Sequence, residues 1–479
     1  MVLRRLAGDA IIYGGADFLT KCIAFMAFPI LAAALTPGDY GVFELILTLA
    51  TLIGLFMNCG LNNATHRYYW DAEEGGETYH SAIVTSGLIS MFLFGFVVLI
   101  IGAGLIPWLL KEMNAHNWPV NWYGLVAALV LLVLTQWIQY CLDVIRLHLL
   151  PWRFFYLSAI TRISGLLLAL YAVVELGQGV DGVFLAQAIM MLFALPLALF
   201  FIRRDLAFSC FSLSWAKNLI HYGYPYIFTG IAFWLFGSID RWMLASMSSV
   251  EEVGIYSVSF RLASVVLFFS TAFGQAWSPI AIKMRSQYPE VYREIYGAVF
   301  LVVLYLMLVI GGGIALFSGE LISVFMPENY AESALPLAIL AFGIAIQGTN
   351  QVSAIGISIE KKTKIFTILS WVTAFINLIL NAILIPQYGG IGAAWATLIS
   401  YLVLSFGYLY FTQKLHPMRF KVNSFLIFLF LGAVLCILSI FFVSNILVWE
   451  IIAFKMIFAI FCLFIGWYLL PIKFIKSFL

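Results

Sequence analysis

The stretch SAIVTSGLISMFLFGFVVLIIGAGLIP, residues 81–107, decides the fold class. It carries no charged residue and is longer than the about 20 apolar residues that a helix needs to cross a bilayer. Fourteen mainly apolar stretches of sufficient length, some of which contain charged residues, predict an all-α integral membrane protein with about fourteen transmembrane helices. Their expected ranges are 9–36, 41–63, 81–107, 120–145, 153–176, 182–202, 219–246, 252–279, 293–317, 333–358, 364–386, 389–412, 423–443 and 448–471.

The composition of the whole chain agrees with a membrane setting. Of its 479 residues, 63% are hydrophobic and 10% are charged, whereas a soluble domain carries about 25% charged residues. A net charge of +2 gives no bulk field that favours nucleic acid. The six cysteines form no C-x-x-C pair, so the sequence indicates neither a metal site nor a disulfide framework, and no cofactor.

The distribution of basic residues predicts the orientation of the chain. Lys and Arg accumulate in cytoplasmic loops, and most of the 25 basic residues fall in every second connection or at the two chain ends. This alternation predicts an even number of spans with both termini in the cytoplasm. The first stretch follows Arg4 and Arg5 without a small-residue cleavage site, so we expect a membrane helix rather than a signal peptide.

Two sequence matches indicate an internal repeat. TPGDYGVF at 36–43 and EEVGIY at 251–256 align Gly41 with Gly254 at an offset of 213, and GVDGVFLA at 179–186 aligns with GGIGAAWA at 389–396 at an offset of 210. Small-residue turns also recur by chance in membrane helices, but two matches at nearly one offset favour six repeated helices plus two extra ones. We therefore expect two pseudo-symmetric six-helix lobes, 1–205 and 206–415, around a cavity, and two C-terminal helices within 416–479.

Three short motifs carry a family resemblance: LTPGDYGVF at 35–43, SIDRWML at 238–244 and EVGIYSVSFRL at 252–262. With them the chain resembles the Wzx-type flippases for O-antigen and exopolysaccharide repeat units, in the multidrug/oligosaccharidyl-lipid/polysaccharide exporter superfamily. The resemblance covers nearly the whole chain. It implies non-enzymatic translocation of an undecaprenyl-pyrophosphate-linked oligosaccharide across the cytoplasmic membrane by alternating access. It also implies membrane lipids and other polysaccharide assembly proteins as partners.

Charged residues inside the predicted spans are the candidates for a transport site. A charge at a helix centre costs about 2.5–3.5 kcal/mol on insertion, so such residues usually face the bundle interior or a wet cavity. The candidate substrate-binding residues are Asp17, Lys21, Arg162, Asp240, Arg241 and Arg261.

Each candidate also has a structural interpretation. Lys21 and Asp17 lie one turn apart, so they form either an ion pair that fixes helix packing or part of a cavity wall. Arg162 and Arg261 are expected near mid-depth, where a guanidinium can bind two phosphate oxygens at once. The adjacent Asp240 and Arg241 point about 100° apart on a regular helix, so we expect them to be poor partners for each other.

Polar and proline residues add weaker indications. Amides such as Asn377 and Asn381 can bond sugar hydroxyls, but they more often join helices. Pro29 and Pro225 fall within the first and seventh predicted spans, which we expect them to bend.

Two other classes of function are compatible with the sequence. A multidrug or cation antiporter of the same superfamily would need a cavity dominated by acids, whereas basic residues slightly outnumber acids inside the spans. A membrane glycan polymerase or ligase would need a large outer loop with catalytic residues, and every predicted connection is short. The sequence does not indicate whether protons or sodium ions drive transport.

Overall fold

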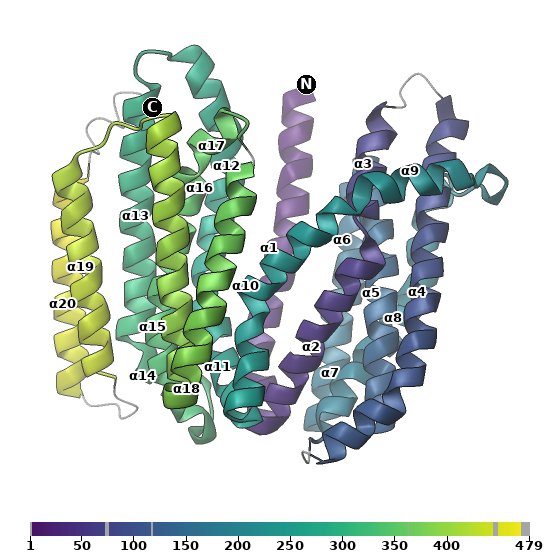
Figure 1. Cartoon of the computed structure of the whole chain (residues 1–479), viewed down its shortest axis with the longest axis horizontal. Coiled ribbons are helices and arrows are strands. Elements are labelled where there is room, and N and C mark those ends of the chain that lie inside the picture. Colours follow the sequence, from purple (N-terminus) through teal and green to yellow (C-terminus); the bar gives the residue numbers. More distant parts are fainter. Residues whose placement is uncertain (1, 72–75, 116–117, 363, 444–448, 471–479) are drawn as a thin grey trace. The chain divides into compact units, whose positions relative to one another are not determined.

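The computed structural model consists of α-helices and their connections (Figure 1). It describes all residues except 1, 72–75, 116–117, 363, 444–448 and 471–479, without the side chains of 2–13, 16–17, 71, 76–77, 279 and 286. In this part of the chain there is no β-strand, and eleven helices are long and apolar enough to cross a membrane. A shorter apolar helix covers Phe18–Ala34. The all-α membrane fold is thus confirmed, whereas the count of fourteen spans is not.

The chain forms two compact units, Met1–Trp234 and Leu235–Leu479, and the expected lobe boundaries near 205 and 415 stay predictions. The helices that begin in the first unit are α1 (Val2–Ala34), α2 (Pro37–Asn58), α3 (Leu61–Asp71), α4 (Gly76–Ala115), α5 (Trp122–Leu147), α6 (Pro151–Ala159), η1 (Ile160–Ser164), α7 (Gly165–Val174), α8 (Gly179–Ile202), η2 (Phe208–Cys210), α9 (Leu213–Gly223) and α10 (Pro225–Met247).

The second unit continues from the last part of α10. Its further helices are α11 (Val250–Ala263), α12 (Val265–Gln287), α13 (Tyr292–Leu316), α14 (Ser318–Phe325), η3 (Glu328–Ser333), α15 (Ala334–Gly348), α16 (Asn350–Ser353), α17 (Ile355–Ile359), α18 (Lys364–Leu415), α19 (Val422–Phe441) and α20 (Trp449–Leu469).

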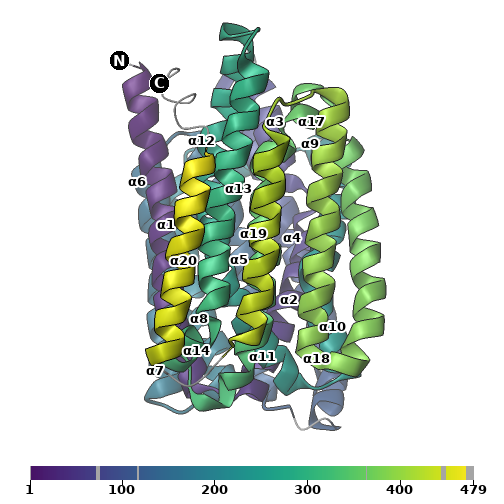
Figure 2. The same cartoon turned by 90° about the vertical axis from the view of Figure 1, so that its left-hand side faces the viewer.

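A central, largely buried helix organises each unit. In the first unit α5 packs against α8, α4 and α2, and Tyr140 of α5 donates a hydrogen bond to the Val84 carbonyl of α4 (3.1 Å). In the second unit α15 packs against α18, α13 and α11, and almost all of its side chains are buried. The C-terminal helices α19 and α20 pack against α13, as Figures 1 and 2 show.

Two local backbone features recur at the matched segments, whereas the internal repeat itself stays a prediction. Gly179 begins α8 with φ = 54°, and Gly389 has φ = 52° at the kink inside α18. Both values lie in the left-handed region that glycine adopts most readily. The earlier pair of segments also corresponds, because the Thr36 and Ser249 hydroxyls each cap a helix by accepting a hydrogen bond from the backbone N–H three residues later.

Several predicted spans are interrupted helices rather than continuous ones. The expected span 219–246 breaks at Tyr224, so Pro225 begins α10 instead of bending a helix interior, whereas Pro29 does lie inside α1. Proline suits the first helical position because its missing N–H is not needed there. The span 252–279 breaks at Ser264 between α11 and α12, and 333–358 consists of α15, α16 and α17.

A further break, between α2 and α3, touches the break between α9 and α10 in the first unit. Gly60, with φ = 68°, lies between α2 and α3, and Gly223 ends α9. A Cβ atom on Gly60 would lie 2.7 Å from the Cα of Gly223, and one on Gly223 would lie 2.9 Å from the carbonyl carbon of Gly60. Only residues without a side chain allow the two backbones to approach this closely.

A buried ion pair attaches α20 to α14 in the second unit. The Lys455 Nζ lies 2.6 Å from the Glu320 Oε1, and Lys455 is fully buried. The second oxygen of the same carboxylate, Oε2, is buried without a hydrogen-bond partner. Tyr305 of α13 adds a hydrogen bond to the Leu463 carbonyl of α20 (2.9 Å).

His416 lies directly after α18 and is 3% exposed. Its Nδ1 is 3.4 Å from the Glu360 Oε1, and its ring packs near Tyr292. Burial lowers the pKa of His416, and the positive charges of Arg285 and Arg293 lower it further. These effects together outweigh the negative charge of Glu360, which raises the pKa.

We expect the protein to become less stable as the pH is lowered, and His416 to account for part of this loss. The unfolded chain binds a proton at the ordinary histidine pKa of about 6.5, whereas the folded chain binds it only at lower pH. Between these two values the unfolded state therefore holds more protons, and acidification favours unfolding. When the pH is lowered from about 7.5 to about 5.5, the melting temperature of wild type should therefore fall further than that of His416→Gln. The exposed His221→Gln should behave like wild type, and equal pH slopes for all three proteins would contradict this account.

Candidate functional site

A π-helical turn carries the arginine of the fifth predicted span. Helices α6 and α7 are joined by η1, whose wider turn places one extra residue in an otherwise α-helical segment. The Thr161 hydroxyl donates to the Leu157 carbonyl (2.8 Å) at the start of this turn. Arg162, the next residue, is exposed. Such π-bulges are frequent at functional sites because they redirect a side chain without ending the helix.

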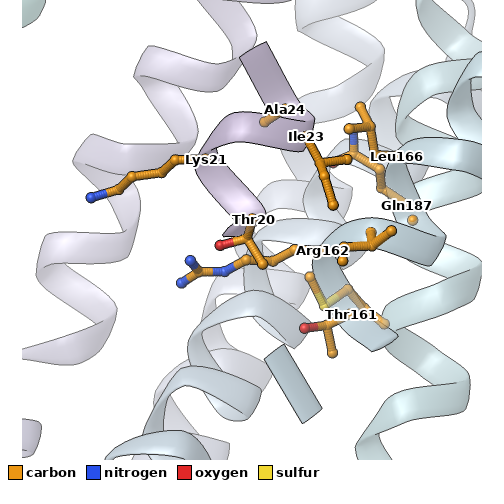
Figure 3. A pocket seen from close by; sticks show the side chains of 11 residues that line it. Thr20, Lys21, Ile23, Ala24, Thr161, Arg162, Leu166 and Gln187 are labelled. Carbon is orange, nitrogen blue, oxygen red and sulfur yellow. The ribbon is translucent and has the colours of Figure 1, made fainter. Parts of the chain in front are cut away.

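Arg162 and Lys21 line one pocket of about 270 Å³ in the first unit. Helix α1 contributes Thr20 and Lys21, η1 contributes Arg162, and α8 contributes Gln187. Figure 3 shows the Lys21 side chain extending away from Gln187, with the Arg162 guanidinium on the Thr20 side of the pocket. The remaining wall is largely apolar and includes Ile23, Ala24, Leu166 and Met191.

The pocket has the chemistry of an anion site beside an apolar surface. Among the described residues that line it, two are basic and none is acidic. The planar guanidinium of Arg162 can bind two phosphate oxygens, while the Lys21 ammonium supplies a compact point charge. Hydroxyl and amide groups from Thr20 and Gln187 can bond neutral oxygens. The pocket can therefore bind a phosphate group that is attached to both polar and apolar parts.

Asp240 and Arg241 lie in the second unit, and the expectation that they are poor partners is wrong. Arg241 Nη1 lies 3.3 Å from Asp240 Oδ1, and both residues are at least 95% buried. Arg241 also donates to Ser257 Oγ (3.2 Å) and to the Gly237 carbonyl (2.9 Å), and Tyr256 donates to Asp240. The long Arg241 side chain folds back along its own helix, which overcomes the angular separation of adjacent residues. This network joins α10 to α11.

The remaining two candidates are Arg261, in the second unit, and Asp17, in the first. Arg261 is half-buried in the last turn of α11, where the Ser264 hydroxyl donates to its carbonyl (2.6 Å) and a cation is favoured by the helix dipole. Asp17 belongs to α1, but its side chain lies outside the described residues. The structure thus brings together Lys21 with Arg162, and Asp240 with Arg241.

Sequence reasoning missed two polar groups in the first unit. Gln187 is a neutral amide in the apolar helix α8, so it gave no charge signal. Asp143 accepts hydrogen bonds from Asn62 Nδ2 (2.6 Å) and Gln139 Nε2 (3.2 Å), which ties α3 to α5. The i, i+4 spacing of Gln139 and Asp143 was the signal in the sequence that could have identified the Asp143 group.

The asparagine pair bonds within one helix, so this contact neither joins two helices nor tests a role in binding sugar. Asn381 Nδ2 donates to Asn377 Oδ1 (3.0 Å), and both residues are buried in the second unit. In the described part of the chain, no group of three or more His, Cys, Asp and Glu side chains is arranged to hold a metal ion.

Comparisons with known families place this geometry in context. Residues 6–285 match the model of the polysaccharide biosynthesis protein family, and residues 225–383 match the MatE family. Because the first match covers more than half of the chain, the protein belongs to the polysaccharide biosynthesis protein family. This confirms the resemblance to the polysaccharide exporters of the multidrug/oligosaccharidyl-lipid/polysaccharide exporter superfamily.

Individual relatives are distant in sequence but match over most of their length. A probable low-salt glycan biosynthesis flippase, Agl15, of Haloferax volcanii is 20% identical, covering 84% of this chain and 82% of the relative. An uncharacterized membrane protein of Methanocaldococcus jannaschii is 22% identical, covering 87% and 85%.

Solved structures share the fold. The lipid II flippase MurJ in an inward closed conformation has a TM-score of 0.74 at 14% identity, covering 97% of this chain and all of that one. An inward-facing multidrug resistance transporter of the MATE family has a TM-score of 0.66 at 15% identity, covering 82% of this chain and 94% of that one. Agl15 is named as a probable flippase, and the two solved structures are of a flippase and a transporter, in agreement with a non-enzymatic function.

Proposed function

We propose that this protein is a flippase that moves an undecaprenyl-pyrophosphate-linked oligosaccharide across the cytoplasmic membrane by alternating access. The oligosaccharide would then serve the assembly of a surface polysaccharide by other proteins. The pocket at Lys21 and Arg162 carries this proposal, because it offers two cations beside an apolar wall in a member of the polysaccharide biosynthesis family. Two of the relatives are named as flippases, one for glycan biosynthesis and one for lipid II.

The residues of the pocket have distinct proposed roles. Arg162 and Lys21 bind the pyrophosphate, Gln187 bonds the first sugar or a phosphate oxygen, and the apolar wall contacts the start of the lipid. Arg261 and Asp17 are proposed as further substrate-binding residues. Asp240 and Arg241, whose groups are already bonded to each other and to α11, are proposed to act through packing of the helices.

The test is complementation of a strain that lacks the gene. Without the protein, the lipid-linked oligosaccharide should accumulate on the cytoplasmic side, and wild type should clear it. A hydrogen bond to a charged group contributes about 1.5–3 kcal/mol, so Arg162→Ala and Lys21→Ala should each slow clearance about ten- to a hundredfold. Arg162→Lys should recover only part of the activity, since lysine cannot bond two oxygens in one plane.

The control removes an equal charge elsewhere. Lys111 is exposed near the end of α4 and does not line the pocket, so Lys111→Ala should clear the oligosaccharide like wild type. All variants are compared at equal amounts of protein in the membrane. Full clearance by both Lys21→Ala and Arg162→Ala would refute the assignment of the pocket.

A multidrug or cation antiporter is the second candidate function. The match to the MatE family and the shared fold with multidrug transporters favour it. The two candidates differ in the charge of the substrate, because two basic residues repel a cationic drug. Efflux of cationic dyes that requires this protein, in cells with no accumulated oligosaccharide, would favour the antiporter.

A further inference from the structure

The segment between α8 and α9 presents aromatic and basic side chains to the outside of the first unit. Phe208 is 72% exposed, Leu213 is 62% exposed and Phe211 is 40% exposed. The basic residues Arg203, Arg204 and Lys217 flank them within the sequence and are exposed as well. The Arg203 guanidinium lies 4.2 Å from the centre of the Phe200 ring, so an apolar surface supports its position.

The inner side of this segment is fixed to α4. The backbone N–H of Ala207 donates to Thr85 Oγ1 (3.1 Å), and that of Ser212 donates to Ser86 Oγ (3.0 Å). Thr85 and Ser86 are fully buried. The exposure of the rings is therefore a consequence of how the backbone is held, and not of a loose loop.

Helix α9 adds a second fixed contact. Trp215 packs edge-on against Tyr68 of α3 and Tyr79 of α4, and Leu219 is fully buried. The helix crosses the ends of α3 and α4 at a steep angle (Figure 1). Its exposed positions after Leu213 are all polar: Ser214, Lys217, Asn218 and His221. Between Arg203 and Gly223 the exposed large hydrophobic side chains are thus confined to the short stretch from Phe208 to Leu213.

The position of the segment along the chain favours a lipid surface. It follows directly after α8, a candidate membrane span that ends at Ile202, so it leaves the helix at the edge of the bilayer. Rings that enter the boundary of the acyl region escape water, while nearby cations meet anionic head groups. A water-facing site would leave the same rings exposed without compensation.

We propose that residues 203–217 bind the surface of the bilayer. Phe208, Phe211 and Leu213 insert at the boundary between head groups and acyl chains, and Arg203, Arg204 and Lys217 bind anionic lipid head groups. The polar face of α9 then lies among the head groups and water. This contact is separate from the pocket at Lys21 and Arg162, and it does not depend on which substrate is carried.

The depth of the segment can be measured in reconstituted vesicles. Spin labels are placed on Phe208→Cys and, as the matched control, on Asn218→Cys, in full-length protein whose native cysteines are replaced by serine. At position 208 the ratio of collisions with oxygen to collisions with a water-soluble nickel chelate should be about tenfold higher than at position 218. Equal ratios would overturn the proposal. A label at 208 that is shielded from both reagents would also overturn it, since a protein partner would then cover the site.

The charge requirement needs a second comparison. Vesicles of phosphatidylcholine alone are compared with vesicles that also contain phosphatidylglycerol. The collision ratio at position 208 should rise with the anionic lipid, and the substitutions Arg203→Gln, Arg204→Gln and Lys217→Gln together should abolish that rise. Melting temperatures establish that each labelled protein is folded. A ratio that is independent of lipid charge, or a rise that persists without the three cations, would overturn the anionic part of the proposal.

Discussion

Gly60→Ala is expected to destabilise the folded protein strongly. The substitution places a Cβ atom 2.7 Å from the Cα of Gly223, closer than real Cβ contacts come, and the obstructing atoms belong to a backbone that cannot rotate away. The left-handed φ of 68° adds about 1–2 kcal/mol for a residue with a side chain. Together these effects should cost about 3 kcal/mol or more, among the larger losses for a single substitution. Gly223→Ala should behave similarly, because its Cβ meets the carbonyl group of Gly60.

Gly177→Ala is the matched control for this prediction. Gly177 has φ = 62°, nearly the same backbone conformation, but a Cβ atom there meets nothing within 4 Å. It should therefore show only the conformational cost of about 1–2 kcal/mol. Melting temperature and the yield of monodisperse protein in detergent measure the difference. Equal melting temperatures for Gly60→Ala and Gly177→Ala would show that the stability of the fold does not depend on the close backbone contact between Gly60 and Gly223.

Lys455→Met is expected to destabilise the second unit strongly. Methionine has a similar length and leaves little space unfilled, so the main effect is the loss of the charge. The Glu320 carboxylate would keep one oxygen without its ammonium partner and the other without any hydrogen bond. Breaking a buried pair from one side typically costs about 3–5 kcal/mol. Thermal unfolding in detergent, with α20 followed by a reporter at the C-terminus, measures the loss.

A double substitution distinguishes an unpaired charge from lost packing. In Lys455→Met/Glu320→Leu both charges are absent, and a buried pair replaced by apolar groups of similar volume is often neutral or stabilising. The double variant should therefore regain most of the stability lost in Lys455→Met. A double variant that is no more stable than the single one would mean that lost packing, and not the unpaired Glu320 charge, causes the loss in Lys455→Met.

The spans of the fold could be predicted from sequence, whereas their interruptions mostly could not. Hydropathy detects an apolar stretch such as 252–279, but the break at Ser264 depends on how α11 and α12 pack against other helices. A break near Gly389 was expected, because one predicted span ends at 386 and the next begins at 389, and the backbone is non-helical at Gly389. The fourteen-span expectation and the eleven candidate helices differ partly because the candidate Lys364–Leu415 contains two helices, one on each side of Gly389.

The candidate site was also visible only in part. Charge inside an apolar span singled out Lys21 and Arg162, and they do line one pocket. Sequence could not show that Glu320 pairs with Lys455, because 135 residues separate them. It also could not show the network of Arg241, whose partner Ser257 is on another helix. Contacts of this kind follow from tertiary packing, which periodicity does not encode.

The π-turn at 160–164 has a consequence for changes in chain length. Removing one residue from a regular α-helix rotates everything after the deletion by about 100° relative to everything before it. In a π-turn the surplus residue is already accommodated, so losing it leaves both flanking helices in register. This helix can therefore shorten by one residue in the course of evolution, at the expense of the direction in which Arg162 points.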